Sequence, residues 1–334
     1  MSAAHALAGD IAQLAKIELH LHLEGCIRPS RIEVWRRNAG AVAPRPLDKL
    51  FQVGSLAEFL QTLDWVCGLV QTPQQVWELA DDFAEYESSQ NLIYAELIIN
   101  PSHWHLSFDD LLLPLLDRFA QIAAQGGVDV GLLPSIGRHQ SQAEALALAQ
   151  WCGDHPHAHL RGLSIDGDER GGSHNQRFAP AFALVKQAGL SATVHAGESS
   201  GPQGVAEALE LLQADRIDHG VRAAEDPRLV AQLAEQQIPL NVCVSSNCHH
   251  LYPSLDAHPL PQLVQAGVRC TLNTDDPMAL GYDLNEELAT LTQAYAWPLE
   301  TLAAFHLTAL DAAFCSPGRK AELRRALQTP LSPR

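Results

Sequence analysis

The chain has 334 residues, of which 46% are hydrophobic and 18% are charged, so it can bury the core of one large folded domain. Its formal net charge is −17. Because a nucleic-acid-binding surface usually carries a basic patch, we expect no nucleic-acid partner. The sequence contains no stretch of 18 apolar residues, so we also expect no helix that crosses a membrane.

The N-terminus and the cysteines indicate a compartment. The first residues lack the positively charged region of a secretory signal peptide, and Asp10 interrupts their apolar run. Seven cysteines, an odd number in a chain of this length, argue against a disulfide framework and are typical of reduced thiols. We therefore expect the protein in the cytoplasm.

Short β-rich runs recur along the chain, alternating with Ala/Leu-rich stretches of helical periodicity. This alternation predicts a parallel sheet, and eight such units predict one α/β domain over residues 1–334, a (β/α)8 TIM barrel. A doubly wound sheet is the structural rival, but no strand is followed by the GxGxxG turn of its dinucleotide-binding form. The predicted strands are 16–22, 93–100, 128–136, 160–166, 192–196, 216–220, 238–246 and 268–276.

The connection after the first strand is much longer than the others. Residues 27–90 include VGSLAEFLQTLDWVCGLV, which is apolar at helical spacing and predicts helices. A helical insertion at the top of a barrel can be a lid over the site, or it can be additional core packing. The sequence leaves both interpretations open.

Titratable side chains gather where the predicted strands end. The first strand ends in HLH, the fourth in IDGDE, the fifth in HAGE, the sixth in DHG and the eighth in NTDDP. Active sites of such barrels lie at the C-terminal ends of the strands, so these groups are expected at one mouth. His20 and His22 are two residues apart in a strand, so both side chains point to the same side. His249 and His250 follow the seventh strand at this end and are candidates for lining the pocket.

This mouth has the composition of a metal site. Imidazole is the commonest neutral metal ligand, and His195, His219, Asp275 and Asp276 are expected to join the two histidines of the first strand. Three histidines and a carboxylate suit a borderline divalent ion, zinc first, with an open position for water. Such an ion brings the pKa of its water from 15.7 to around 7. Glu198, on the turn just past the fifth strand, can then point at a substrate and handle a proton.

The ordered motifs ELHLHLEG, IGRHQ, GDE, VHAGE, RIDHG and LNTDDP resemble the adenosine deaminase family of the amidohydrolase superfamily. The resemblance covers residues 16 to about 310, and it implies the zinc-dependent hydrolytic deamination of a 6-aminopurine. It also implies one zinc ion per chain, or another divalent transition metal such as Fe²⁺. The implied ligands of this ion are His20, His22, His195 and Asp275.

The resemblance implies further roles at the same site. Asp275 would also accept a proton from the attacking water, and Glu198 would protonate ring N1. His219 would orient and stabilise the attacking hydroxide without binding the metal. Asp276 would hold the ring near N7, and Gly167 would bring a backbone N–H towards N3.

Glu24 bears on which purine is the substrate. Family members that act on adenosine typically carry Asp at this position, next to the ribose 5′-hydroxyl, whereas base-only adenine deaminases often have LEG, as here. Base-only members usually lack the RHQ (138–140) and GDE (167–169) elements, and this chain has both. We therefore expect a nucleoside substrate, with adenosine or deoxyadenosine converted to inosine or deoxyinosine plus ammonia. The alternative is adenine or an N6-substituted adenine; another metal-dependent amidohydrolase or a non-catalytic binding protein are the remaining rivals.

Overall fold

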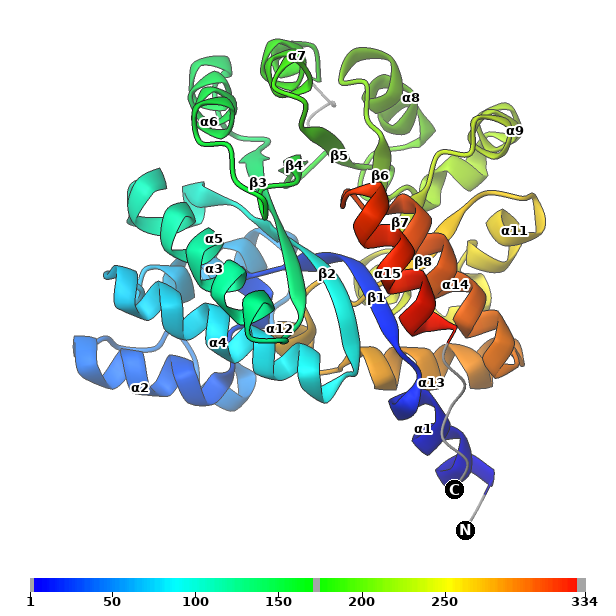
Figure 1. The fold of residues 1–334 in the computed structure, drawn as a ribbon, viewed down its shortest axis with the longest axis horizontal. Coiled ribbons are helices and arrows are strands. Elements are labelled where there is room, and N and C mark those ends of the chain that lie inside the picture. Colours follow the sequence, from blue (N-terminus) through cyan, green and yellow to red (C-terminus); the bar gives the residue numbers. More distant parts are fainter. Residues whose placement is uncertain (1–2, 171–174, 329–334) are drawn as a thin grey trace.

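The structure, a computed structural model, describes residues 3–170 and 175–328. Eight parallel strands, paired in the order β1 to β8, form a barrel that helices surround (Figure 1). The predicted (β/α)8 barrel is confirmed. The strands are β1 Lys16–His22, β2 Leu92–Ile99, β3 Asp129–Gly137, β4 Gly162–Asp166, β5 Ser191–Ala196, β6 Arg216–His219, β7 Leu240–Val242 and β8 Cys270–Leu272.

The helices of the described residues lie outside the barrel and across its ends. The α-helices are α1 Ala3–Gln13, α2 Pro29–Ala39, α3 Leu56–Cys67, α4 Pro73–Ser89, α5 Phe108–Ala124, α6 Gln142–Asp154, α7 Ala179–Gln187, α8 Pro202–Leu211, α9 Pro227–Gln236, α10 Val244–His250, α11 Leu260–Gln265, α12 Pro277–Leu280, α13 Leu284–Tyr295, α14 Leu299–Ala312 and α15 Pro317–Leu327. Short 3₁₀ helices are η1 Glu24–Cys26, η2 Leu47–Lys49, η3 Pro101–His103, η4 Asn175–Arg177, η5 Val221–Glu225 and η6 Leu255–Ala257.

The barrel closes between β1 and β8. Leu21 pairs with Asp275 in a parallel bridge, and the backbone N–H of His22 donates to the Asp275 carbonyl at 2.9 Å. Every residue of β3 is buried, as expected for a strand with the barrel interior on one face and helices on the other. Closure brings the HLH and NTDDP motifs, far apart in the sequence, side by side.

The prediction of a strand over residues 238–246 is wrong at its end, because β7 stops at Val242 and α10 begins at Val244. The first N–H groups of a helix lack partners within the helix and must be satisfied from outside. The buried carboxylate of Glu287 does this, since it accepts from the backbone N–H of Ser245 at 3.1 Å and from the Ser245 hydroxyl. An apolar run that resembles a strand therefore starts a helix, because a residue 42 positions away caps it.

The prediction for residues 268–276 is also too long, because β8 ends at Leu272. The backbone N–H and the hydroxyl of Thr274 donate to Glu18 Oε1 at 2.6 and 2.7 Å. These bonds replace the strand pairing and turn the chain towards the barrel mouth. The other six predicted strands agree with the structure to within two residues at each end.

Residues 27–90 contain α2, α3 and α4, which lie together on one side of the barrel (Figure 1). α4 packs against β2 and α5, in the manner of the other outer helices. α3 instead packs against η1 and η3, which follow the C-terminal ends of β1 and β2. α3 is therefore the part of the insertion that reaches the mouth of the barrel, and its motion as a lid stays a prediction.

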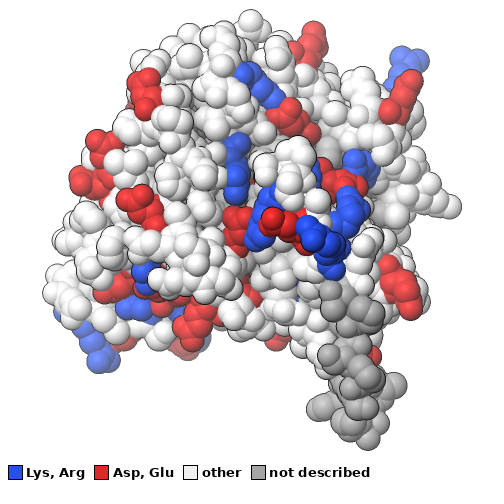
Figure 2. Space-filling view, viewed as in Figure 1, with Lys and Arg blue, Asp and Glu red and all other residues white. Residues whose placement is uncertain are grey.

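On the face shown in Figure 2, basic and acidic side chains are interspersed. The basic residues of α15 follow this pattern, since Arg319 pairs with Asp129 at 2.8 Å and Arg324 pairs with Asp311. All seven cysteines are free thiols. Within the described residues, no helix has the length and apolar character needed to cross a membrane.

Candidate active site

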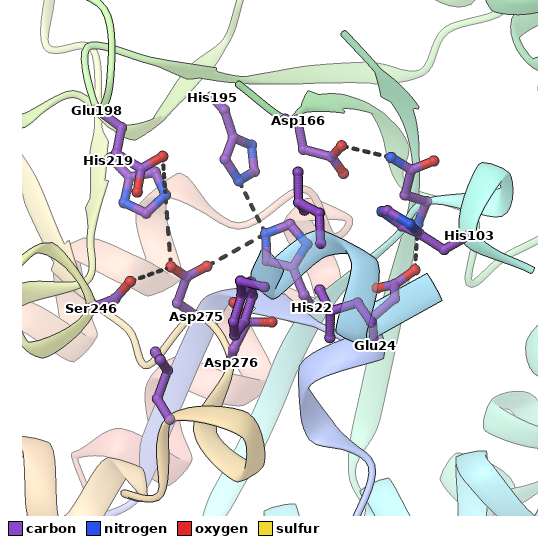
Figure 3. A pocket seen from close by; sticks show the side chains of 16 residues that line it. His22, Glu24, His103, Asp166, His195, Glu198, His219, Ser246, Asp275 and Asp276 are labelled. Atoms are coloured by element: carbon purple, nitrogen blue, oxygen red, sulfur yellow. Dashed lines mark hydrogen bonds and ion pairs between the residues drawn. The ribbon is translucent and has the colours of Figure 1, made fainter. Parts of the chain in front are cut away.

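Three imidazoles and one carboxylate meet at the C-terminal end of the barrel, and Figure 3 shows three of these four side chains. His20 and His22 come from β1, His195 comes from β5, and Asp275 follows β8. His20 Nε2 lies 3.0 Å from Asp275 Oδ1, and His22 Nε2 lies 3.0 Å from His195 Nε2. One possible ligand atom from each residue lies within 4.8 Å of the other three. The fold thus brings together the four residues that the sequence singles out as metal ligands.

Asp218, which sequence reasoning missed, orients two of these imidazoles from behind. Its Oδ1 lies 3.0 Å from His20 Nδ1, and its Oδ2 lies 3.5 Å from His195 Nδ1. Burial alone would raise the pKa of Asp218, but His20 holds it well below its usual range, so the group is a carboxylate. A carboxylate on Nδ1 keeps the hydrogen there and leaves Nε2 free to bind a metal ion. The available signal was its place directly before His219 and two residues after Arg216, on the inward face of β6.

The charges of the cluster fit a divalent cation. Burial lowers the pKa of His22, and burial and His20 together lower the pKa of His195 well below its ordinary value, so both imidazoles are neutral. Burial would also lower the pKa of His20, but Asp218 and Asp275 raise it to about 10. A bound cation would displace this proton and satisfy the converging nitrogens. Three imidazole nitrogens and one carboxylate oxygen are ligands that zinc accepts.

Glu198 lies on the turn after β5 and faces the cluster (Figure 3). Its Oε2 is 3.8 Å from His219 Nε2. Burial, and next the negative charge of Asp275, raise the pKa of Glu198 to about 8. The side chain therefore carries a proton at pH 7 and can give it to a substrate.

Glu169 clamps this turn, and sequence reasoning assigned it no role. Its buried carboxylate accepts from three successive backbone N–H groups, those of residues 197, 198 and 199, at 2.9 to 3.0 Å. It also accepts from the Ser200 hydroxyl. The N–H of Glu169 in turn donates to Ser199 Oγ at 3.1 Å. Glu169 therefore fixes the backbone that carries Glu198.

His219 and Asp275 both have left-handed backbone conformations, with φ of 61° and 72°. A residue other than glycine in this region is strained by about 1–3 kcal/mol, and such strain concentrates at functional sites. Asp275 is held further by Ser246, whose hydroxyl donates to Asp275 Oδ2 at 2.6 Å. Ser246 is a second residue that sequence reasoning missed. It reaches the site because α10 begins directly after β7.

Asp276 lines the cavity beside Asp275. Its Oδ1 is buried and has no hydrogen-bond partner among the described residues. Burial, and next the charge of Asp275, raise the pKa of Asp276 well above its ordinary value, which favours the protonated carboxyl group. A side chain at Gly25 would place its Cβ 1.9 Å from Asp276 Oδ1, which explains the glycine of the LEG motif. Gly167 lines the same cavity with φ +94°, a conformation that favours glycine.

Glu24 is buried and lines the same cavity. Its Oε1 accepts from the backbone N–H of Asn100 at 2.8 Å and from Trp104 Nε1 at 2.9 Å. Its Oε2 is buried and has no hydrogen-bond partner among the described residues. Trp104 could not be inferred from the sequence, because it lies 80 residues from Glu24 along the chain.

The cavity is bounded on its outer side by apolar residues. Phe59, Leu60 and Leu63 come from α3 and Leu280 ends α12, around a space of about 660 Å³ that includes part of the open mouth. His249 lines a neighbouring cavity between α2, η2 and α12 instead of this one. The side chain of His250 lies outside the described part of the structure.

The chain is similar to known deaminases along nearly its whole length. The family model described as adenosine deaminase matches residues 15–330. Relatives named adenine deaminase include one from Vibrio parahaemolyticus, which is 30% identical over 326 residues and covers 95% of this chain and 96% of its own length. Another, from Sinorhizobium medicae, is 33% identical over 321 residues, with 95% of this chain and 99% of its own length covered.

Solved structures show the same architecture. The structure of an adenine deaminase from Arthrobacter aurescens has a TM-score of 0.88 and 26% identity, and covers 94% of this chain and 98% of its own. An amidohydrolase from Burkhoderia ambifaria, solved with bound Zn, also has a TM-score of 0.88 and 26% identity, and covers 98% of this chain and 92% of its own. The chain is therefore a hydrolytic deaminase of the same fold, and the cluster at the barrel mouth is a candidate metal centre. The chain belongs to the adenosine deaminase family.

Proposed function

We propose that this protein converts adenine and water into hypoxanthine and ammonia. One zinc ion per chain would be held by His20, His22, His195 and Asp275. The substrate assignment is supported by the relatives named adenine deaminase, which match nearly the whole chain. It replaces the nucleoside expected from the sequence with the alternative considered there.

The observation that carries this choice is the arrangement around Glu24. Oε1 is occupied by Asn100 and Trp104, whereas the buried Oε2 has no partner among the described residues. A bare purine has an N–H in its five-membered ring, where a nucleoside carries the sugar, and this N–H can donate to Glu24 Oε2. A nucleoside would leave the oxygen unpaired, and an unpaired buried polar group costs about 1–3 kcal/mol.

On sequence alone, the RHQ and GDE elements favour a nucleoside, but their contacts support another role. Arg138 Nη2 donates to the carbonyl oxygen of His195 at 2.6 Å, and Nη1 donates to Asn175 Oδ1 at 2.9 Å. Glu169 of GDE clamps the turn that carries Glu198. Both elements therefore serve the backbone around the catalytic turn, and neither requires a sugar.

The residues of the site divide the work of deamination. When bound, the zinc ion supplies Lewis-acid activation of a water molecule. Glu198 gives its proton to ring N1, which makes C6 more electrophilic. Asp275 accepts a proton from the water, and His219 contacts the attacking oxygen. When its carboxyl group is protonated, Asp276 can donate a hydrogen bond to N7, opposite the ring N1 that Glu198 protonates. Asp275 then gives the water proton to the amino group, the C6–N bond breaks and ammonia leaves. The hydroxyl proton returns to Glu198 as the C6 carbonyl of hypoxanthine forms.

The test is kcat/KM for adenine, adenosine, deoxyadenosine and an N6-substituted adenine, measured by ammonia release. We expect adenine to be preferred by about tenfold or more, the equivalent of about 1.4 kcal/mol. Glu24→Asp should narrow this preference, because the shorter side chain withdraws Oε2 and opens space. Glu144→Asp, on the exposed start of α6, is the matched control and should leave the ratio unchanged. A tenfold preference for adenosine in the parent would show that the nucleoside is the substrate.

A further inference from the structure

Behind His219, two polar side chains continue in a buried line away from the cavity. His219 Nδ1 lies 3.1 Å from Nδ2 of Asn247 on α10, and Asn247 Oδ1 lies 3.2 Å from Nε2 of His258, just after η6. His258 Nδ1 lies 3.1 Å from the backbone nitrogen of Leu260. The three side chains belong to residues that are 1%, 0% and 3% exposed. Which group donates in each of these hydrogen bonds follows from the contact between His258 and the backbone of Leu260.

The backbone N–H of Leu260 fixes the first direction. A backbone N–H can only donate, so His258 Nδ1 accepts and carries no hydrogen. Burial lowers the pKa of His258 to about 4, so this imidazole is neutral at pH 7 and its one hydrogen is on Nε2. His258 Nε2–H therefore donates to Asn247 Oδ1.

Asn247 passes this direction on to His219. Its carbonyl oxygen faces His258, so its amide NH₂ group faces His219 Nδ1. An NH₂ group can only donate, and a hydrogen on Nδ1 would point at its hydrogens. His219 therefore accepts at Nδ1 and carries its hydrogen on Nε2. That nitrogen is on the cavity side, 3.8 Å from Glu198 Oε2 and 3.9 Å from Asp275 Oδ2.

The neighbouring histidines have the opposite arrangement. The Asp218 carboxylate lies 3.0 Å from Nδ1 of His20 and 3.5 Å from Nδ1 of His195, where it favours a hydrogen on Nδ1 and leaves Nε2 for a metal ion. His219 has an amide NH₂ group in the corresponding position. The same side chain is thereby prepared as a metal ligand where a carboxylate stands behind it, and as a hydrogen-bond donor where an amide does.

We propose that Asn247 and His258 are positioning residues that keep the hydrogen of His219 on Nε2, so that His219 donates a hydrogen bond to the oxygen attacking C6 and does not act as the base. This inference rests on the proposed deaminase function. The water proton goes to Asp275, the proton for N1 comes from Glu198, and His219 keeps its own hydrogen throughout.

The direct test is ¹⁵N NMR of the zinc-loaded protein with labelled histidine, with the His219 signals identified by their loss in His219→Gln. In the parent, the protonated nitrogen of His219 should be Nε2. Asn247→Asp replaces the amide donor with an acceptor, so the hydrogen should move to Nδ1. Because this removes one donor to the developing negative charge, kcat should fall by about 10²-fold, with KM and zinc content nearly unchanged.

Two variants of His258 give a second test of the His219 tautomer, one that should disturb it and one that should restore it. His258→Phe removes the donor to Asn247 Oδ1, so both tautomers of His219 should appear and kcat should fall less than in Asn247→Asp. His258→Gln keeps an N–H in reach of that oxygen and should restore the parent tautomer. His306→Phe, at another buried histidine on α14, is the control and should change neither the His219 tautomer nor kcat. If Asn247→Asp does not fold, the His258 pair decides the question.

The two proposals fail separately. A parent His219 with its hydrogen on Nδ1 would overturn the positioning role, whatever the substrate. The same follows if Asn247→Asp or His258→Phe keeps both the parent tautomer and the parent kcat. Absence of ammonia release from any purine, with the hydrogen on Nε2, would instead overturn the deaminase proposal and the catalytic role drawn from it.

Discussion

The barrel interior buries two groups of charged side chains, and they are arranged on different principles. In the lower group, Arg216 at the start of β6 lies 2.7 Å from Glu96 on β2, and both side chains are fully buried. Glu96 also accepts from the Tyr94 hydroxyl at 2.7 Å, and the Arg216 guanidinium donates to the Ala312 carbonyl at 3.1 Å. Each charge in the lower group has its partner within the chain.

The upper group, formed by His20, His22, His195 and Asp275, is not matched in this way. Two of its imidazoles face each other, with His22 Nε2 3.0 Å from His195 Nε2. Behind this group, the Asp218 carboxylate contacts Nδ1 of His20 and of His195. It therefore holds the possible metal-ligand atoms in place without a bound ion. Burial of charge is therefore by itself no sign of function. Possible metal-ligand atoms that converge on one point, held by a second layer of side chains, are the sign of a site.

The largest expected effect lies in the upper region. Glu198→Gln should lower kcat by about 10²–10⁴-fold, because an amide cannot give a proton to N1. Zinc content and the free energy of unfolding should stay near those of the parent. Steady-state kinetics with adenine, together with elemental analysis, provide the measurement.

The pH dependence of the parent belongs to the same prediction. Glu198 must be protonated to act, and its pKa is about 8, so kcat/KM should fall as pH rises through about 8. Glu198→Gln should lose this limb of the profile. A variant that retains activity within tenfold of the parent would exclude Glu198 as the acid.

The next largest effect is expected from the buried Arg216–Glu96 pair. Its loss should change the free energy of unfolding and leave metal binding intact. Arg216→Met leaves Glu96 buried without its partner, which should cost about 3–5 kcal/mol of unfolding free energy. Denaturant unfolding measures this loss. The double variant Arg216→Met with Glu96→Gln should recover part of it, while each variant keeps a full equivalent of zinc. Loss of zinc in Arg216→Met would mean that the two regions are not separate.

Asp218→Asn tests the layer behind the metal ligands. The amide cannot hold the Nδ1 hydrogens of both His20 and His195, so zinc affinity should fall by about 10–100-fold. Competition with a chelator measures the affinity. Asp168→Asn, on the exposed side of the GDE element, is a suitable control. Unchanged zinc affinity in Asp218→Asn would show that Asp218 does not prepare His20 and His195 for metal binding.

The smallest effect is expected from Glu169→Gln, which keeps the shape of the clamp but loses its charge. A neutral amide satisfies the three N–H groups less well, so kcat should fall by about tenfold, less than the loss of the acid itself. KM and zinc content should change little, because neither depends on the position of Glu198. A change confined to KM would contradict a role through Glu198.

Much of the fold and of the candidate site could be predicted because their signals are local. Five of the eight strands end in a titratable motif, and the barrel brings these ends together whatever the connecting helices do. Glu169 and Ser246, which hold the site in place, gave no local signal. Glu169 reaches the turn 28 residues later, and Ser246 reaches Asp275 across 29. The start of α10 was missed for the same reason, since the distant Glu287 caps it. The roles of RHQ and GDE could be judged only once their contacts were known.

The central claim is that the upper group is built for one metal ion that deamination requires. The protein should be stripped with a chelator and titrated with zinc, while bound metal and ammonia release from adenine are followed together. Activity should rise in proportion to bound zinc and level off at about one equivalent per chain, and His20→Ala should neither bind tightly nor regain activity. Full turnover with less than about a tenth of an equivalent of metal would contradict the account.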